Sequence, residues 1–211
     1  MKTRNNSYLI GFIVTIALFS ACGPTFQTAT NIDQGRQALF RHDNPSALTY
    51  FQDAANAEPN YIYGSELREG TLSFLGRAQY LNSQFAPAQS TLQKALAQHK
   101  SDNLARLYLG MNKARQGDRT SGLRDMQSGT KGIGAFLNYI TTNFAGEFGQ
   151  YWDPNQSLRK SVQSNLAMMS QENVDWAALF SNSEALALNF EQEPDRARSQ
   201  EEHQLELERS R

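Results

Sequence analysis

The side chains that most often carry metal or nucleophilic chemistry are scarce in this chain of 211 residues. Cysteine occurs once, as Cys22, so the chain has no internal disulfide framework and no cysteine-based metal site. The histidines His42, His99 and His203 are far apart, and none has a partner at the spacing that places two ligands on one helix face. We therefore expect no metal and no cofactor, and we interpret the histidines as surface or packing residues.

Carboxylates offer another route to catalysis, but the sequence pairs none of them by spacing. Glu147 and Asp153 would act as an acid–base pair only if folding brought them together. The chain also has no glycine-rich loop after a strand and no nucleophile–base signature. We therefore predict that the protein is not an enzyme, with a carboxylate site assembled by the fold as the alternative.

Cys22 lies at the end of an export signal. Lys2 and Arg4 precede a twelve-residue apolar run, residues 8–19, and two small residues then lead to the cysteine. This order is typical of a signal peptide. The run is too short to cross a bilayer as a helix, which takes about 20 residues. We assign residues 1–21 to a signal peptide.

The end of this signal, Phe19-Ser20-Ala21-Cys22, resembles the lipobox of bacterial lipoproteins, with Phe19 where leucine is usual. The resemblance implies a diacylglycerol thioether on Cys22 and an acyl group on its amine, and several chains anchor a protein firmly. Gly23 follows, in place of the aspartate of an inner-membrane retention signal, so we expect the outer membrane, with the protein facing the periplasm. An ordinary secretory signal that contains a cysteine is the alternative.

The composition is that of an ordinary folded protein, with 39% hydrophobic and 19% charged residues. Without the signal the chain carries 18 basic and 21 acidic side chains, a formal net charge of −3. This balance argues against nucleic acid as a partner, because neutralising phosphates takes a basic surplus or a basic face. Residues 22–30 are polar and contain a proline, which predicts a short tether.

Small and large residues recur at fixed spacing in three segments of the first half. Each segment has a glycine followed after 12, then 4, then 3 residues by a small, a large apolar and another small residue: Gly35, Ala47, Phe51, Ala54; Gly76, Ala88, Leu92, Ala95; Gly110, Gly122, Met126, Gly129. Two helices of a hairpin approach closely where a small residue faces a large one. The pattern predicts three helical hairpins, with helix starts at Asn44-Pro45, at Pro87 and at Gly117-Asp118.

This spacing resembles the tetratricopeptide repeat, over residues 28–134. The glycines are 41 and 34 residues apart, and the longer interval implies an insertion of about seven residues near residues 61–65. The usual tryptophan is absent from all three repeats, and only the first has a closing proline, Pro59. We predict an all-α fold in which residues 31–134 form a short solenoid, with a plain helical bundle as the alternative.

The resemblance also implies which side chains face the concave surface. These lie one and four residues after each glycine: Arg36, Leu39, Arg77, Tyr80, Met111 and Ala114. Two arginines one repeat apart suit a carboxylate or an acidic peptide, because guanidinium binds carboxylate through two hydrogen bonds. The simpler interpretation, which we favour from sequence, is two solvated arginines whose stems lie on the helices.

The second half is expected to cap the last repeat. Residues 135–190 contain an aromatic helical stretch, a helix that starts at Asp153-Pro154, and two short helices that open near Asp175 and run through Leu186. Trp152 is a candidate second docking residue, since exposed aromatics anchor interfaces. Pro194 is expected to interrupt the chain, and residues 191–211 are expected to form a charged, exposed, frayed tail.

Together these features predict a membrane-anchored helical-repeat scaffold that binds another envelope protein or a peptide. An assembly factor similar to a pilotin is a narrower version of this hypothesis. A cell-wall or envelope enzyme is the competing class.

Overall fold

The structure, a computed structural model, describes residues 23–210; the predicted signal peptide, residues 1–21, and Cys22 lie outside this range. Its helices are α2 (Gly23–Phe40), α3 (Asn44–Ala57), α4 (Thr71–Leu81), α5 (Phe85–Gln98), α6 (Asn103–Arg115), α7 (Arg119–Asn143), α8 (Ser157–Met169) and α9 (Trp176–Arg209), with a short 3₁₀ helix η2 (Phe148–Tyr151). The strands β1 (Ile62–Tyr63) and β2 (Glu69–Gly70) form one small hairpin. The predicted all-α fold class is confirmed.

The glycines of the repeated spacing lie where two helices touch. Gly35 on α2 faces the ring of Phe51 on α3, and a Cβ added to Gly76 on α4 would lie 2.6 Å from Cγ of Leu92 on α5. On α6, Gly110 packs directly against the backbone of α7, where the carbonyl of Gly122 would lie 2.7 Å from an added Cβ. The close approach expected from the spacing is therefore present in the pairs α2–α3, α4–α5 and α6–α7.

The helix starts follow the expected residues closely, with small shifts. Asp118 caps α7 by accepting a hydrogen bond from the Ser121 amide at 3.1 Å. Asp43, one residue before the expected Asn44, caps α3 in the same way. Helix α5 begins at Phe85, so Pro87 lies in its first turn, where no helical N–H is lost.

The expected tether at residues 22–30 is wrong for the part that the structure describes. Helix α2 already begins at Gly23, and Thr28 is fully buried. The Thr25 hydroxyl donates a hydrogen bond of 2.7 Å to the Glu58 carboxylate, beyond the end of α3. Pro24 is compatible with this helix because amides of the first turn have no partner within the helix.

The insertion between the first two helix pairs forms the β-hairpin. Its strands are antiparallel, with Ile62 opposite Gly70 and Tyr63 opposite Glu69. Thr71, the first residue of α4, donates to the Tyr61 carbonyl through its amide at 3.0 Å and its hydroxyl at 3.1 Å. The hairpin is thereby fixed to α4, and it carries Tyr63 and Glu69 toward the inner surface of the helix pairs.

The expected boundary at residue 134 is absent, because α7 runs without a break to Asn143. The glycines of α7 do not break this helix, because tertiary packing stabilises it: Gly122 and Gly129 lie against the backbone of α6. The two short helices expected after Asp175 are likewise one helix, α9, which continues through Pro194. Within residues 23–210, no helix has the length and apolarity needed to cross a bilayer.

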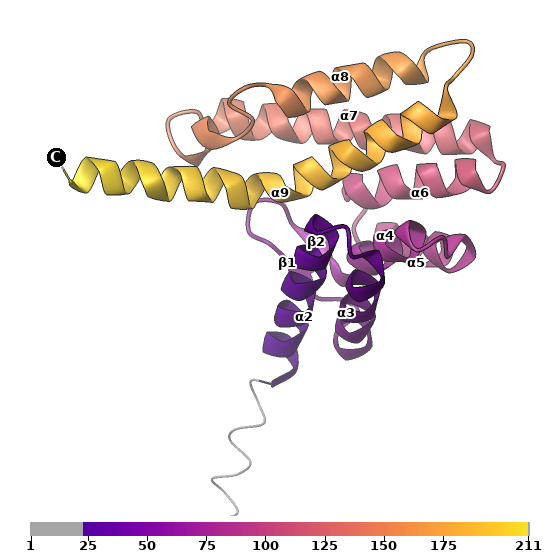
Figure 1. Ribbon diagram of the computed structural model, residues 1–211, viewed down its shortest axis with the longest axis horizontal. Helices are drawn as coiled ribbons and strands as arrows, with labels where there is room; N and C mark the ends of the chain where they lie inside the picture. Colours follow the sequence, from indigo (N-terminus) through magenta and orange to yellow (C-terminus); the bar gives the residue numbers. More distant parts are fainter. Residues whose placement is uncertain (1–22, 211) are drawn as a thin grey trace, which may run out of the picture.

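Helix α9 joins the two halves of the molecule. Figure 1 shows it between the α2–α5 helices and the α7–α8 pair, with its C-terminal end extending past the other helices. Its apolar residues belong to the main core, among them Leu179, Leu186 and Phe190. A second core lies between α2, α3 and α4 around Phe51 and Phe74.

Candidate functional site

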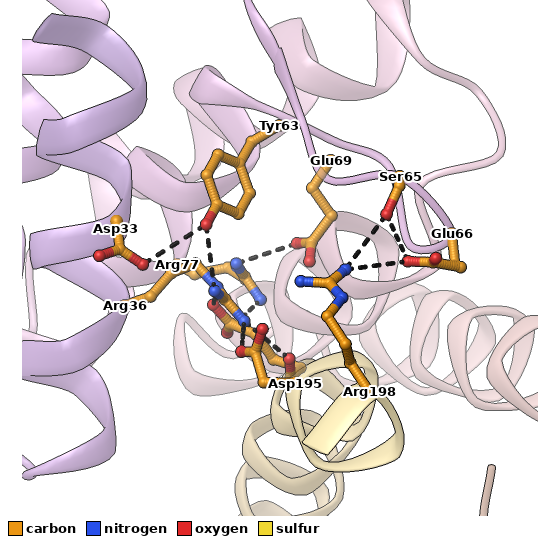
Figure 2. Close-up of polar contacts among 10 residues, drawn as sticks. Asp33, Arg36, Tyr63, Ser65, Glu66, Glu69, Arg77, Asp195 and Arg198 are labelled. Atoms are coloured by element: carbon orange, nitrogen blue, oxygen red, sulfur yellow. Dashed lines mark hydrogen bonds and ion pairs between the residues drawn. The ribbon is translucent and has the colours of Figure 1, made fainter. Parts of the chain in front are cut away.

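The two arginines singled out by the repeat spacing, Arg36 and Arg77, lie at the centre of a buried ion cluster. They are only 5% and 1% exposed, so the interpretation as solvated arginines is wrong. The cluster also contains Glu69 from β2 and Glu191 and Asp195 from α9, and we call these five residues the arginine cluster (Figure 2).

Glu191 bridges the two arginines. Its Oε2 lies 2.9 Å from Nη1 of Arg77, and its Oε1 lies 3.3 Å from Nε of Arg36. Arg36 also donates through Nη2 to the Glu191 carbonyl at 3.0 Å and to Asp195 Oδ2 at 2.6 Å. From the sequence, these arginines could receive a carboxylate of a partner, but the carboxylates of Glu191 and Asp195 that reach them come from the protein's own last helix.

Glu69 closes the opposite side of Arg77. Its Oε2 lies 2.9 Å from Nη2 of Arg77, without the alignment of a hydrogen bond. Burial raises the pKa of Glu69 to about 8; the charge of Arg77 opposes this rise, and the charges of Glu191 and Asp102 add to it. A carboxyl group with a raised pKa limits the excess of negative charge in the cluster.

Aromatic rings complete the surroundings of both guanidinium groups. The guanidinium of Arg77 lies 4.7 Å from the ring centroid of Phe74, and that of Arg36 lies 5.2 and 5.3 Å from Phe40 and Tyr63. Burial alone would lower the pKa of each arginine. Nearby negative charges, of which Glu191 has the largest effect, more than offset burial and raise the pKa of both arginines above the ordinary value. Both guanidinium groups are therefore firmly held as cations.

A second polar contact ties α9 to α4 and α6. The Tyr80 hydroxyl donates to Glu184 at 2.8 Å and accepts from Nε of Arg115 at 2.7 Å. Burial, and next the charge of Glu184, raises the pKa of Tyr80 well above its usual range. Arg115 also lies 4.4 Å from the ring centroid of Phe180. Tyr80, predicted to face a partner, thus contacts α9.

The remaining candidate residues are all buried. Leu39, Met111 and Ala114 are between 0 and 5% exposed. Trp152 is 2% exposed and packs edge-on against Phe136 at 5.7 Å between ring centroids. The expectation of an exposed docking tryptophan is therefore wrong: the loop after η2 folds Trp152 into the core.

A groove remains open between the inner surface of the helix pairs and α9. Its volume is about 470 Å³, and its lining includes Leu39, Leu81 and Tyr108 on one side and Ala185, Leu188 and Asn189 on the other. A smaller cavity of about 220 Å³ lies over the arginine cluster between the hairpin and α9. Leu39 is the one predicted partner-binding residue that lines the groove.

The two carboxylates considered for catalysis lie in different surroundings, one buried and one exposed. Asp153 accepts hydrogen bonds from the amides of Leu158 and Arg159 at 2.8 and 3.2 Å, whereas Glu147 is exposed. The expected helix start at Asp153-Pro154 is wrong, because α8 begins at Ser157 with Gln156 as its N-cap. Asp153 and Gln156 have positive φ angles, so the chain turns at both residues before the helix begins. The carboxylate serves as an internal acceptor that shapes this turn.

Sequence reasoning missed the acidic members of the arginine cluster, Glu69, Glu191 and Asp195, and it also missed Glu184, which contacts Tyr80 and Arg115. The expected exposed tail from residue 191 is wrong up to Ala197, since Glu191, Glu193 and Ala197 are buried. One signal in the sequence could have indicated this burial. Phe190 continues the apolar face of Leu179 and Leu186, and it directly precedes Glu191.

Comparison of the chain with protein-family models, with curated proteins and with solved structures finds no match.

Proposed function

We propose that the protein is a lipid-anchored helical-repeat scaffold of the bacterial cell envelope, which binds a protein or peptide partner in the groove beside α9. The three helix pairs with a glycine at each close contact support a tetratricopeptide-like arrangement. The lipobox-like end of the export signal supports the anchor at Cys22 and a place in the outer membrane.

The groove is the observation that carries the binding role. Its lining is mixed: apolar side chains of Leu39, Leu81 and Leu188 alternate with polar and charged groups that include His42, Glu184 and Asn189. A surface that offers both apolar contact and hydrogen-bonding groups suits a peptide segment, whose backbone needs hydrogen-bond partners and whose side chains can pack on the leucines. The arginine cluster has a structural role in this proposal, because it holds α9 in the position that forms one wall of the groove.

Photocrosslinking in the native envelope tests the binding role. A photoreactive residue at Asn189, which is exposed in the groove, is expected to capture a discrete partner, whereas the same residue at Gln204 on the projecting end of α9 is not. Ala185→Arg would fill the groove and is expected to reduce capture. Equal capture at both positions, or capture unaffected by Ala185→Arg, would contradict binding in the groove.

The anchor has its own test. Cys22→Ser is expected to leave the export signal uncleaved by the lipoprotein peptidase and to change how the protein fractionates with membranes. Mass spectrometry of the native mature protein is expected to show an acylated N-terminal cysteine, and an unmodified N-terminus there would refute the anchor.

A further inference from the structure

The first turn of α2 is part of the folded body. Thr25 is tied to Glu58 by the 2.7 Å hydrogen bond, and Thr28 is fully buried. No flexible spacer therefore lies between Gly23 and the packed helix pairs. Because Cys22 precedes Gly23 directly, a lipid on Cys22 would hold the body itself at the membrane surface.

Phe26 is the most exposed large apolar side chain within residues 23–210, at 76%. Three helical steps, about 5 Å, separate the Cα atoms of Gly23 and Phe26, and one peptide unit of about 3.8 Å joins Gly23 to Cys22, so chain geometry keeps the two Cα atoms of Phe26 and Cys22 within about 9 Å of each other. The headgroup layer of a bilayer is about 5–8 Å thick on each side. A lipid on Cys22 therefore keeps Phe26 within reach of this layer.

The helix pairs have two distinct edges. At one edge the start of α2 meets the end of α3 through Thr25 and Glu58, and Gln98 at the end of α5 donates to Asn60 at 2.6 Å. At the other edge the turn after α4 meets the start of α3, where Asn82 donates to the Asn44 carbonyl at 2.8 Å. Only the first edge contains the residues next to Cys22.

We propose that Phe26 inserts into the headgroup layer of the membrane that carries the Cys22 lipid, with the edge formed by Thr25, Glu58, Asn60 and Gln98 facing that surface. This placement rests on the lipid anchor of the proposed function. An exposed aromatic ring beside acyl chains adds buried apolar area to an anchor that already holds the protein at the interface. It also fixes the orientation of the body, which a flexible tether would leave free.

Fluorescence quenching in vesicles tests this placement. The full lipidated protein, purified from bacterial membranes, is reconstituted into vesicles of phosphatidylethanolamine and phosphatidylglycerol with lipids brominated near the headgroup. Phe26→Trp is the probe, and Gln84→Trp, at an exposed position in the turn at the opposite edge, is the matched control. Emission of the wild-type chain, from Trp152 and Trp176, is subtracted as background.

Quenching of the added fluorescence is expected to be at least about twofold larger for Phe26→Trp than for Gln84→Trp, since only the first indole reaches the interface. Equal quenching of the two variants would overturn the placement. Co-flotation of the wild-type protein with vesicles is measured in the same samples. Failure to float refutes the anchor and with it this placement, whereas flotation without selective quenching refutes the placement alone.

Discussion

Arg77 and Glu191 are 114 residues apart in the chain, yet their side chains meet at 2.9 Å in the interior of the molecule. The contact joins the second helix pair to the last helix, and Glu191 extends it to the first pair through Arg36. A charged contact over this separation makes the stability of the N-terminal helix pairs depend on the C-terminal helix.

Removal of Arg77 is expected to be strongly destabilising. Arg77→Met leaves Glu191 and Glu69 buried near each other with one guanidinium fewer, and breaking a buried ion pair from one side costs about 3–5 kcal/mol. Urea unfolding followed by circular dichroism measures the loss. Arg198→Met is the matched control, because Arg198 is 52% exposed and its contacts are long, 3.5 Å to Glu66 and 3.4 Å to Ser65. Similar unfolding free energies for the two variants would show that the cluster contributes no more than a surface pair.

Two C-terminal truncations separate the buried part of α9 from its projecting end. Removing residues 191–211 takes away Glu191 and Asp195 and leaves two buried arginines without these partners, so we expect a loss of about 3–5 kcal/mol. Removing residues 199–211 deletes mostly exposed helix and is expected to change stability by about 0.5 kcal/mol or less. The sequence-based expectation of an exposed tail from residue 191 therefore holds only for the projecting end of α9. Thermal melts of both truncations test this division, which fails if they melt alike.

The helix pairs were predictable because their signal is local and periodic. A glycine and a large apolar residue at a fixed spacing in the sequence indicate that two neighbouring helices are in contact. Gly76 and Leu92 have this spacing, and they lie against each other in the structure. The positions of Arg36 and Arg77 on the inner surface follow from the same spacing. Their partners do not, because nothing near either arginine in the chain specifies a helix that begins at Trp176.

The C-terminal half was harder to predict for two physical reasons. Charge-rich segments are usually solvated, so the sequence predicts that Glu191 belongs to an exposed tail, but in the structure Glu191 is buried and two arginines compensate its charge. A proline usually interrupts a helix, but α9 is held just before Pro194 by Glu193, which accepts a hydrogen bond from the Asp153 amide, and just after it by Asp195, which accepts one from Arg36. Tertiary contacts therefore override both local rules.

The close contact of α6 and α7 predicts a large effect of a single methyl group. Gly110→Ala places a Cβ against the backbone of α7, near the amide of Met126 and 2.7 Å from the Gly122 carbonyl, and backbone cannot rotate away. We expect a loss of about 1–3 kcal/mol in urea unfolding, despite the better helix propensity of alanine. Gly146→Ala is the control, since an added Cβ there meets no atom within 4 Å. A Gly110→Ala protein as stable as this control would mean that the helices are further apart than the structure places them.

The raised pKa of Glu69 predicts a specific dependence of stability on pH. Burial raises this pKa to about 8, so between the ordinary glutamate range and pH 8 the folded state holds a proton that the unfolded state has released. Stability therefore falls as pH rises through this window, and the cost disappears in Glu69→Gln, which stays neutral. The other charges that act on Glu69 are Arg77, Glu191, Asp102 and Arg36, and all are retained in the variant.

Unfolding free energies of the wild type and of Glu69→Gln, measured in urea at pH 5.5, 7 and 8.5, isolate this contribution. Because one pKa unit corresponds to about 1.4 kcal/mol, we expect the variant to gain on the order of 1 kcal/mol relative to the wild type per pH unit across the window. Burial also raises the pKa of Asp102. Because Asp102 is present in both proteins, its contribution to the pH dependence of stability cancels in the difference. A difference that stays constant from pH 5.5 to 8.5 would show that Glu69 is ionised throughout and that Arg77 fully compensates its burial.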